Sequence, residues 1–188
     1  MNLPSVESTT LESVLLIVPH RFADDRGHFC ETYSQRAFEH VGVTCEFIQD
    51  NQSFSRQVGT VRGLHFQIPP FAQAKLVRVL RGAIFDVAVD IRRGSDTYGQ
   101  SFDATLSAEN GRQLFVPEGF AHGFCTLEAD TEVLYKVNAS HSRDHERGLK
   151  WNDPLLGIAW PVAESAVVIL DRDRDLPSLA VLPEYFRL

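Results

Sequence analysis

Short runs of apolar or alternating residues, separated by glycines and other turn residues, most constrain the fold of this 188-residue chain. In the run 83–91, every second residue from Phe85 to Ile91 is large and apolar, which is the period of a half-buried strand. Eight such runs at regular spacing predict a β-sandwich or barrel. They are residues 47–51, 60–67, 75–80, 83–91, 102–106, 113–116, 120–127 and 132–138.

The N-terminal part of the chain adds two strands and one helix. The apolar run 14–18 is closed by a proline, which predicts a strand at a sheet edge or against a partner chain. Residues 28–33 alternate and predict another strand, with an Asp- and Gly-rich turn at 22–27 before it. Ser34 is expected to cap a short helix that continues to His40. The prediction is an all-β fold with short peripheral helices.

The dipeptide Asn110-Gly111 is the strongest hairpin signal in the chain. Asn-Gly adopts the positive φ angles that a two-residue hairpin turn requires. We therefore expect a hairpin turn between the runs 102–106 and 113–116.

Length and composition indicate one globular domain spanning residues 1–188, since 44% hydrophobic and 23% charged residues are ordinary for a folded protein. No apolar run of eighteen residues and no charged leader before an apolar stretch are present, so a cytoplasmic protein with no membrane contact is expected. The three cysteines have no Cys-x-x-Cys spacing, which favours reduced thiols over disulfides or a zinc site.

The net charge of −7 argues against binding to nucleic acid. Four cations nevertheless cluster in one region of this acidic chain, which leaves open a local basic pocket for a small anion. They are Arg62, Lys75, Arg78 and Arg81.

His65 and Lys75 lie on two neighbouring predicted strands. Inside a barrel they could converge as a base and as a cation that stabilises an oxyanion. The simpler alternatives are a hydrogen-bonded core histidine and a surface lysine on a strand. Similarly, the charge-rich run 171–175 is either a solvated loop or the source of a carboxylate that folds back to orient a histidine.

Residues 117–124, Pro-Glu-Gly-Phe-Ala-His-Gly-Phe, resemble the second half of the signature of metal-binding cupins. The first half is broken, because His65-Phe66-Gln67 and Lys75 stand where a metal cupin has two histidines and a glutamate. An ammonium group repels a divalent ion, and the remaining histidines are too few for a catalytic metal site. We therefore expect no metal.

Many separated motifs together resemble the dTDP-4-dehydrorhamnose 3,5-epimerase family from about Phe22 to Pro177. The resemblance implies a homodimeric cupin jelly roll without a cofactor, with the N-terminal strand at the dimer interface and the C-terminal segment packed on the barrel. It also implies epimerisation at C3 and C5 of a nucleotide-linked 4-keto-6-deoxyhexose in deoxysugar biosynthesis, with dTDP as the nucleotide. The motifs are Phe29-x-Glu31, Gln49-Asp-Asn51, Arg62-Gly-Leu-His65-Phe-Gln, Ala72-Gln-Ala-Lys75-Leu-Val-Arg78, Asp86-Val-Ala-Val-Asp90, Pro117-x-Gly-Phe-Ala-His122-Gly-Phe, Tyr135-Lys136 and Trp151-Asn-Asp-Pro.

The resemblance also implies four catalytic residues. His65 would be the base that removes the proton beside the ketone, and Asp173, four residues before Pro177, would be its partner. Lys75 would lie beside the C4 oxygen and favour the enolate. Tyr135 would return the proton; alternation between two valines points its ring inward, where a packed core tyrosine is the alternative.

Substrate-binding positions follow from the same resemblance. Arg62 is expected at the diphosphate, because the guanidinium fork suits paired phosphate oxygens. Strict alternation places Arg62 and His65 on opposite strand faces, so either a bulge at Gly63 or a substrate that wraps the strand end must reconcile them. The other expected contacts are Arg26, Phe29, Glu31, Gln49, Asn51, His122 and His141.

Ser140-His141 departs from the family pattern, in which aromatic residues form a stacking surface or a wall near the tyrosine. Arg143 also stands where a proline is common. These departures leave three hypotheses: the 3,5-epimerase, an epimerase that acts at one centre or on another sugar nucleotide, and a non-catalytic cupin that binds a nucleotide sugar.

Overall fold

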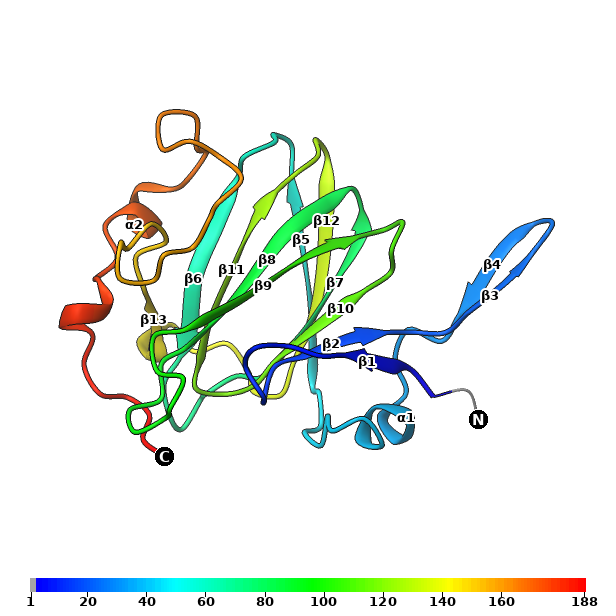
Figure 1. Ribbon diagram of the computed structural model, residues 1–188, viewed down its shortest axis with the longest axis horizontal. Coiled ribbons are helices and arrows are strands. Elements are labelled where there is room, and N and C mark those ends of the chain that lie inside the picture. The colour runs from blue at the N-terminus through cyan, green and yellow to red at the C-terminus, as the bar shows by residue number, and fades with distance from the viewer. Residues whose placement is uncertain (1–2) are drawn as a thin grey trace.

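The computed structural model describes residues 3–188 and consists mainly of two antiparallel sheets that face each other (Figure 1). The six-stranded sheet has the order β1 (Ser5–Glu7), β2 (Leu15–Val18), β10 (Gln113–Val116), β7 (Lys75–Arg81), β12 (Thr131–Val137) and β5 (Gln49–Ser55). The five-stranded sheet has the order β13 (Glu146–Gly148), β6 (Val61–Gln67), β11 (Phe120–Thr126), β8 (Ala83–Asp90) and β9 (Ser101–Ser107). The predicted all-β jelly-roll class is confirmed.

The helices are short and peripheral, as expected. They are α1 (Gln35–Glu39), α2 (Asp171–Arg174) and the 3-10 turns η1 (Arg143–His145) and η2 (Leu179–Val181). Ser34 occupies the N-cap position of α1, but its side chain makes no capping hydrogen bond, so that detail of the prediction is wrong. None of the helices within residues 3–188 is long and apolar enough to cross a membrane.

A two-stranded hairpin of β3 (Arg21–Asp24) and β4 (Gly27–Cys30) projects from the body on the side away from the C-terminal segment (Figure 1). The predicted turn at 22–27 is too long, because the strands pair up to Asp24 and Gly27. The strand expected at 28–33 ends at Cys30 and joins neither large sheet.

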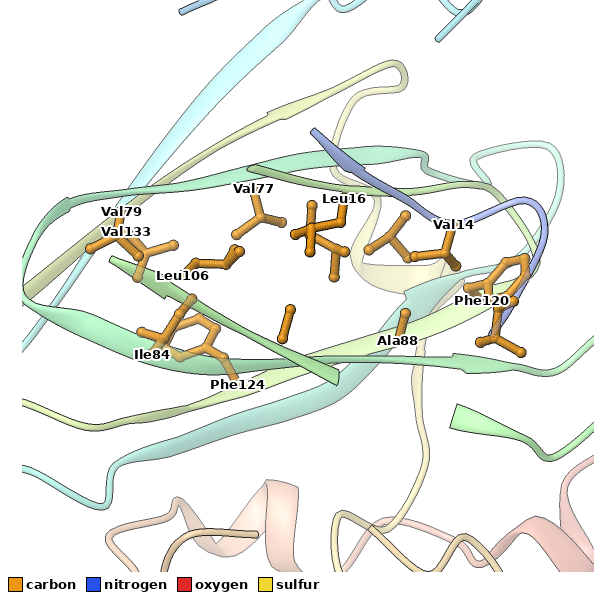
Figure 2. Close-up of a cluster of buried hydrophobic side chains, with 14 residues drawn as sticks. Val14, Leu16, Val77, Val79, Ile84, Ala88, Leu106, Phe120, Phe124 and Val133 are labelled. Carbon is orange, nitrogen blue, oxygen red and sulfur yellow. The ribbon is translucent and has the colours of Figure 1, made fainter. Parts of the chain in front are cut away.

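The main core lies between the two sheets (Figure 2). Val77, Val79 and Val133 from one sheet point toward Ile84 and Phe124 from the other. All are buried, and burying a side chain of this size contributes about 1.5–3 kcal/mol. The prediction of a half-buried strand at 83–91 is wrong, because both faces of β8 are buried. Ile84 and Ala88 face the other sheet, while Val87 and Val89 pack in a second cluster with Leu156 and Leu179 of the C-terminal segment.

Two sequence predictions about strand pairing are wrong. β2 is not an edge strand, because β1 pairs with its outer side. Asn110-Gly111 does not close a hairpin, since β9 and β10 belong to different sheets. The Asn110 side-chain oxygen instead accepts hydrogen bonds from the backbone N–H groups of Ser107 and Arg112, which shape a loop that passes from one sheet to the other.

Candidate active site

The space between the sheets changes from apolar to polar toward one end. Lys75 and Tyr135 come from the six-stranded sheet, and His65 and His122 come from the five-stranded one. Lys75 lies on the same face of β7 as Val77 and Val79, which belong to the core. All four polar side chains line a cavity of about 770 Å³.

A bulge in β6 brings Arg62 to the same face as His65. His65 lies opposite His122 and Arg62 lies opposite Phe124, so three steps along β6 match two steps along β11. Gly63, at a φ of +117°, lies in this bulge, and a Cβ there would be 2.7 Å from backbone atoms of β11. Of the two alternatives, the structure contains the bulge at Gly63, and the side chains of Arg62 and His65 both line the cavity.

His65 and Asp173 are joined by a hydrogen bond of 2.9 Å between Nε2 and Oδ1. The other Asp173 oxygen accepts a hydrogen bond from the Gly63 N–H at 3.4 Å. Burial opposes ionisation of Asp173, but these hydrogen bonds and the charge of His65 hold the pKa of Asp173 below its ordinary value. Because the ionised carboxylate accepts from Nε2, the imidazole Nδ1 is left free to accept a proton.

Lys75 is almost fully buried, with 8% of its surface exposed. Its Nζ donates a hydrogen bond to the backbone oxygen of His65 at 3.2 Å. Burial lowers the pKa of Lys75 to about 8, while the charges of Asp86 and Glu146 act in the opposite direction. The side chain therefore carries its charge at neutral pH in a buried position, where it interacts strongly with a developing oxyanion.

His122 forms a second histidine–carboxylate pair, with 2.8 Å between its Nε2 and Asp86 Oδ1. Both residues are buried. Burial lowers the pKa of His122, and Asp86 opposes this shift. With Nε2 donating to Asp86, the Nδ1 of His122 is available as a hydrogen-bond acceptor.

Tyr135 is half-buried, and burial raises the pKa of its phenol, with Arg62 acting in the opposite direction. It therefore keeps its proton at neutral pH and can act as a donor. Arg62 is held by the Ser55 hydroxyl at 3.2 Å and the Phe54 backbone oxygen at 3.0 Å. A guanidinium fixed in this way at the cavity wall can bind phosphate oxygens.

A comparison with known protein families matches residues 8–181 to the one described as dTDP-4-dehydrorhamnose 3,5-epimerase. The chain belongs to this family. It is 53% identical over 181 residues to the dTDP-4-dehydrorhamnose 3,5-epimerase of Sinorhizobium fredii, covering 96% of this chain and 92% of that protein.

Solved structures of the 3,5-epimerase family share this fold. The Bacillus anthracis enzyme, crystallised with TDP and PPi, is 50% identical, with a TM-score of 0.90 over 93% of this chain and 99% of that one. The Legionella pneumophila enzyme, in complex with dTDP-4-keto-L-rhamnose, is 38% identical, with a TM-score of 0.93 over 98% of each chain. The jelly roll is thus the cupin fold of these epimerases.

Seven of the residues expected from the epimerase resemblance line the cavity. The other five do not. Arg26 and Phe29 lie on the projecting hairpin, where Phe29 is 70% exposed and Arg26 pairs with Asp24. The seven are His65, Lys75, Tyr135, Asp173, Arg62, His122 and His141, and the remaining three outside the cavity are Glu31, Gln49 and Asn51.

Gln49 and Asn51 lie on the strand that forms part of the cavity wall. They share one face of β5 with Ser53 and Ser55, both of which line the cavity. Gln49 donates a hydrogen bond to the side-chain oxygen of Asn51 at 2.8 Å. Their amides therefore continue the polar wall beyond the cavity, whereas the hairpin residues are separated from it.

Four charged residues to which the sequence analysis gave no role also line the cavity: Arg56, Arg143, Glu146 and Arg172. Glu146 is 3.3 Å from His141, between Oε2 and Nε2. Arg143, Glu146 and Arg172 lie in charge-rich stretches without strand periodicity, which the sequence presents only as loops. The high density of charged residues in the stretches 142–150 and 171–175, the second of which contains the predicted Asp173, is the sequence signal that could have identified them.

Proposed function

We propose that this protein epimerises a dTDP-linked 4-keto-6-deoxyhexose at C3 and C5, in deoxysugar biosynthesis. The observation that carries the proposal is the arrangement of four groups around one cavity. His65 faces in from one sheet with its partner Asp173 supplied by α2, while Tyr135 and Lys75 face in from the other sheet. A base, a cation and an opposed acid are what inversion beside a ketone requires.

The first half of the reaction is proton removal. Nδ1 of His65 takes the proton from the carbon beside the C4 ketone, and Asp173 stabilises the imidazolium through Nε2. The electron pair moves to the C4 oxygen, where the Lys75 ammonium stabilises the enolate more than the ketone. Removing a donor of this kind costs about 10²–10³-fold in rate.

The second half is proton return to the other face. Tyr135 and His65 stand on opposite sheets, so a sugar ring between them presents one face to each. Delivery of the phenolic proton to the carbon inverts the centre and leaves a phenolate, which recovers its proton from solvent while His65 loses the one it took. Repetition at the second carbon gives the doubly inverted product.

The chemistry needs no metal in this proposal. His65 and His122 are both engaged by carboxylates, and the Lys75 ammonium occupies the inner end of the cavity. Within residues 3–188 no group of three or more histidine, cysteine, aspartate or glutamate side chains is arranged to hold a metal ion. Stabilisation of the enolate oxygen in this proposal is the role of the Lys75 ammonium, through its charge and its hydrogen bonds.

A homodimer accounts for the expected contacts that lie outside the cavity. The hairpin carries an exposed pair of aromatic rings, Phe22 and Phe29, whose centroids are 6.4 Å apart. In a dimer this hairpin would bring Arg26, Phe29 and Glu31 to the cavity of the partner subunit, next to Gln49 and Asn51. A cytoplasmic location is part of the same proposal; cell fractionation and light scattering test the location and the dimer.

The direct test of function is incubation of the purified protein with dTDP-4-keto-6-deoxyglucose, followed by NMR assignment of the product. We expect inversion at both C3 and C5, and none with the variant His65→Asn. Inversion at one centre only would support the narrower epimerase, and binding without any inversion would support the non-catalytic cupin.

A further inference from the structure

Asp86 is a fully buried acid next to the cavity, and the mechanism above does not use it. Its Oδ1 accepts the hydrogen bond from His122. Its Oδ2 is buried and has no hydrogen-bond partner among the described residues. A buried carboxylate persists only when donors or a nearby positive charge compensate its desolvation. The hydrogen bond of His122 satisfies one oxygen and leaves the other without a donor, so a nearby positive charge would stabilise this carboxylate.

The positive charge available to Asp86 is Lys75. Asp86 lies on the same face of β8 as Ile84 and Ala88, and these two belong to the core between the sheets. Lys75 points into the same space from β7 on the opposite sheet. No carboxylate in the described part of the chain is within salt-bridge distance of Lys75, but charges interact over longer distances where water is excluded.

We propose that Asp86 is a positioning residue: by its charge, and by the hydrogen bond that fixes His122, it holds Lys75 as an ammonium at the inner end of the cavity. The inference rests on the proposed function only in that the ammonium is the form that stabilises an enolate. Besides Asp86, the titratable groups around Lys75 are His65 on β6, His122 on β11, Glu146 on β13 and Tyr135 on β12.

The direction of the effect follows from the titration of Lys75. Burial lowers its pKa to about 8, and the charge of Asp86 is the larger of the two that oppose this. Removing that charge lowers the pKa of Lys75 further. A variant without the Asp86 charge would therefore lose the ammonium form of Lys75 at a pH where Lys75 of the wild-type protein is still protonated.

The test is an NMR titration of the protein labelled with ¹³Cε-lysine. The chain has lysines only at positions 75, 136 and 150, so the signal absent from Lys75→Arg identifies Lys75. In Asp86→Asn we expect the titration midpoint of Lys75 to fall by about 1 unit. An unchanged midpoint would overturn the proposal. Asp86→Ser carries the same expectation, so a folding failure of one variant still leaves a test.

Asp90→Asn is the matched control. Asp90 lies on the same strand and is equally buried, but Arg92, Ser95 and Thr97 satisfy its carboxylate. We expect this variant to leave the Lys75 midpoint in place, and Asp86→Glu to restore it. A purely structural role for Asp86 would lower the stability of Asp86→Asn without moving the midpoint.

Activity provides a second measurement. The alkaline limb of kcat/KM should move to lower pH in Asp86→Asn and stay in place in Asp90→Asn. A shifted NMR midpoint in a protein without epimerase activity would refute the proposed function and support the role of Asp86. Epimerase activity with an unmoved midpoint of Lys75 in Asp86→Asn would support the proposed function and refute the role of Asp86.

Discussion

Asp173 lies 108 residues from His65 in the chain, yet its Oδ1 is 2.9 Å from the imidazole Nε2. The same carboxylate accepts the N–H of Gly63 in the β6 bulge. One acid therefore ties the C-terminal helix α2 to both the imidazole and the backbone turn that sets its direction. The base is completed only when the C-terminal segment packs against β6.

Gly63→Ala tests whether the bulge is required. A Cβ would be 2.7 Å from backbone atoms of Gly123 and His122, and the φ of +117° disfavours any side chain. We expect a loss of more than about 3 kcal/mol in the free energy of unfolding, since the backbone strain alone costs about 1–3 kcal/mol. Denaturant titration measures it.

Gly27→Ala is the control for Gly63→Ala. Gly27 has a similar φ of +134°, but nothing lies within 4 Å of the Cβ position. The variant Gly27→Ala should therefore lose only the free energy of unfolding that the backbone strain costs, about 1–3 kcal/mol. Equal losses in the two variants would mean that contact with β11 does not make Gly63 necessary.

Tyr135→Phe should separate proton removal from proton return. We expect the variant to keep deuterium exchange at the carbon beside the ketone, because His65 can remove and return a proton on one face. Inversion should fall by about 10²-fold or more, the usual contribution of a positioned acid. NMR of exchange and of product configuration in D₂O measures both, and an equal loss of both would contradict this division of labour.

His141→Tyr addresses the departure from the family pattern at the cavity rim. His141 is exposed and contacts Glu146, so it confines the phenol of Tyr135 less than a larger aromatic would. We expect the tyrosine to raise the fraction of doubly inverted product at early times. Product ratios by NMR decide this, and an unchanged ratio would show that residue 141 does not govern how many centres invert.

Chelation of divalent ions should leave activity unchanged. Lys75 presents a positive charge where a metal would have to bind, and each cavity histidine is already paired with a carboxylate. Activity assays before and after treatment with EDTA measure this. A loss that a divalent ion restores would refute the metal-free mechanism.

The pattern of apolar and polar residues along the chain predicted most of the strands. The strand Ser101–Ser107 follows directly from alternation, and the conflict between Arg62 and His65 indicated the bulge at Gly63 as one of two alternatives. The hairpin at Asn110-Gly111 failed because a turn residue indicates a change of direction, not the sheet in which the next strand pairs.

The cavity rim was the least predictable part of the site. Arg143, Glu146 and Arg172 come from segments whose path is fixed by long-range packing, as in the pairing of β13 with β6. Resemblance supplied Asp173 where periodicity could not distinguish it from its charged neighbours. The resemblance did not give the spatial position of every residue that it named. Arg26 and Phe29 lie on a hairpin away from the cavity of their own chain.

Deuterium incorporation from D₂O tests the central claim most directly. The account predicts that the protein, with a dTDP-4-keto-6-deoxyhexose substrate, places solvent deuterium at both C3 and C5 of the inverted product, and that His65→Asn places it at neither. Incorporation at a single carbon, or inversion at both carbons without solvent deuterium, would contradict epimerisation at two centres through enolates formed by His65.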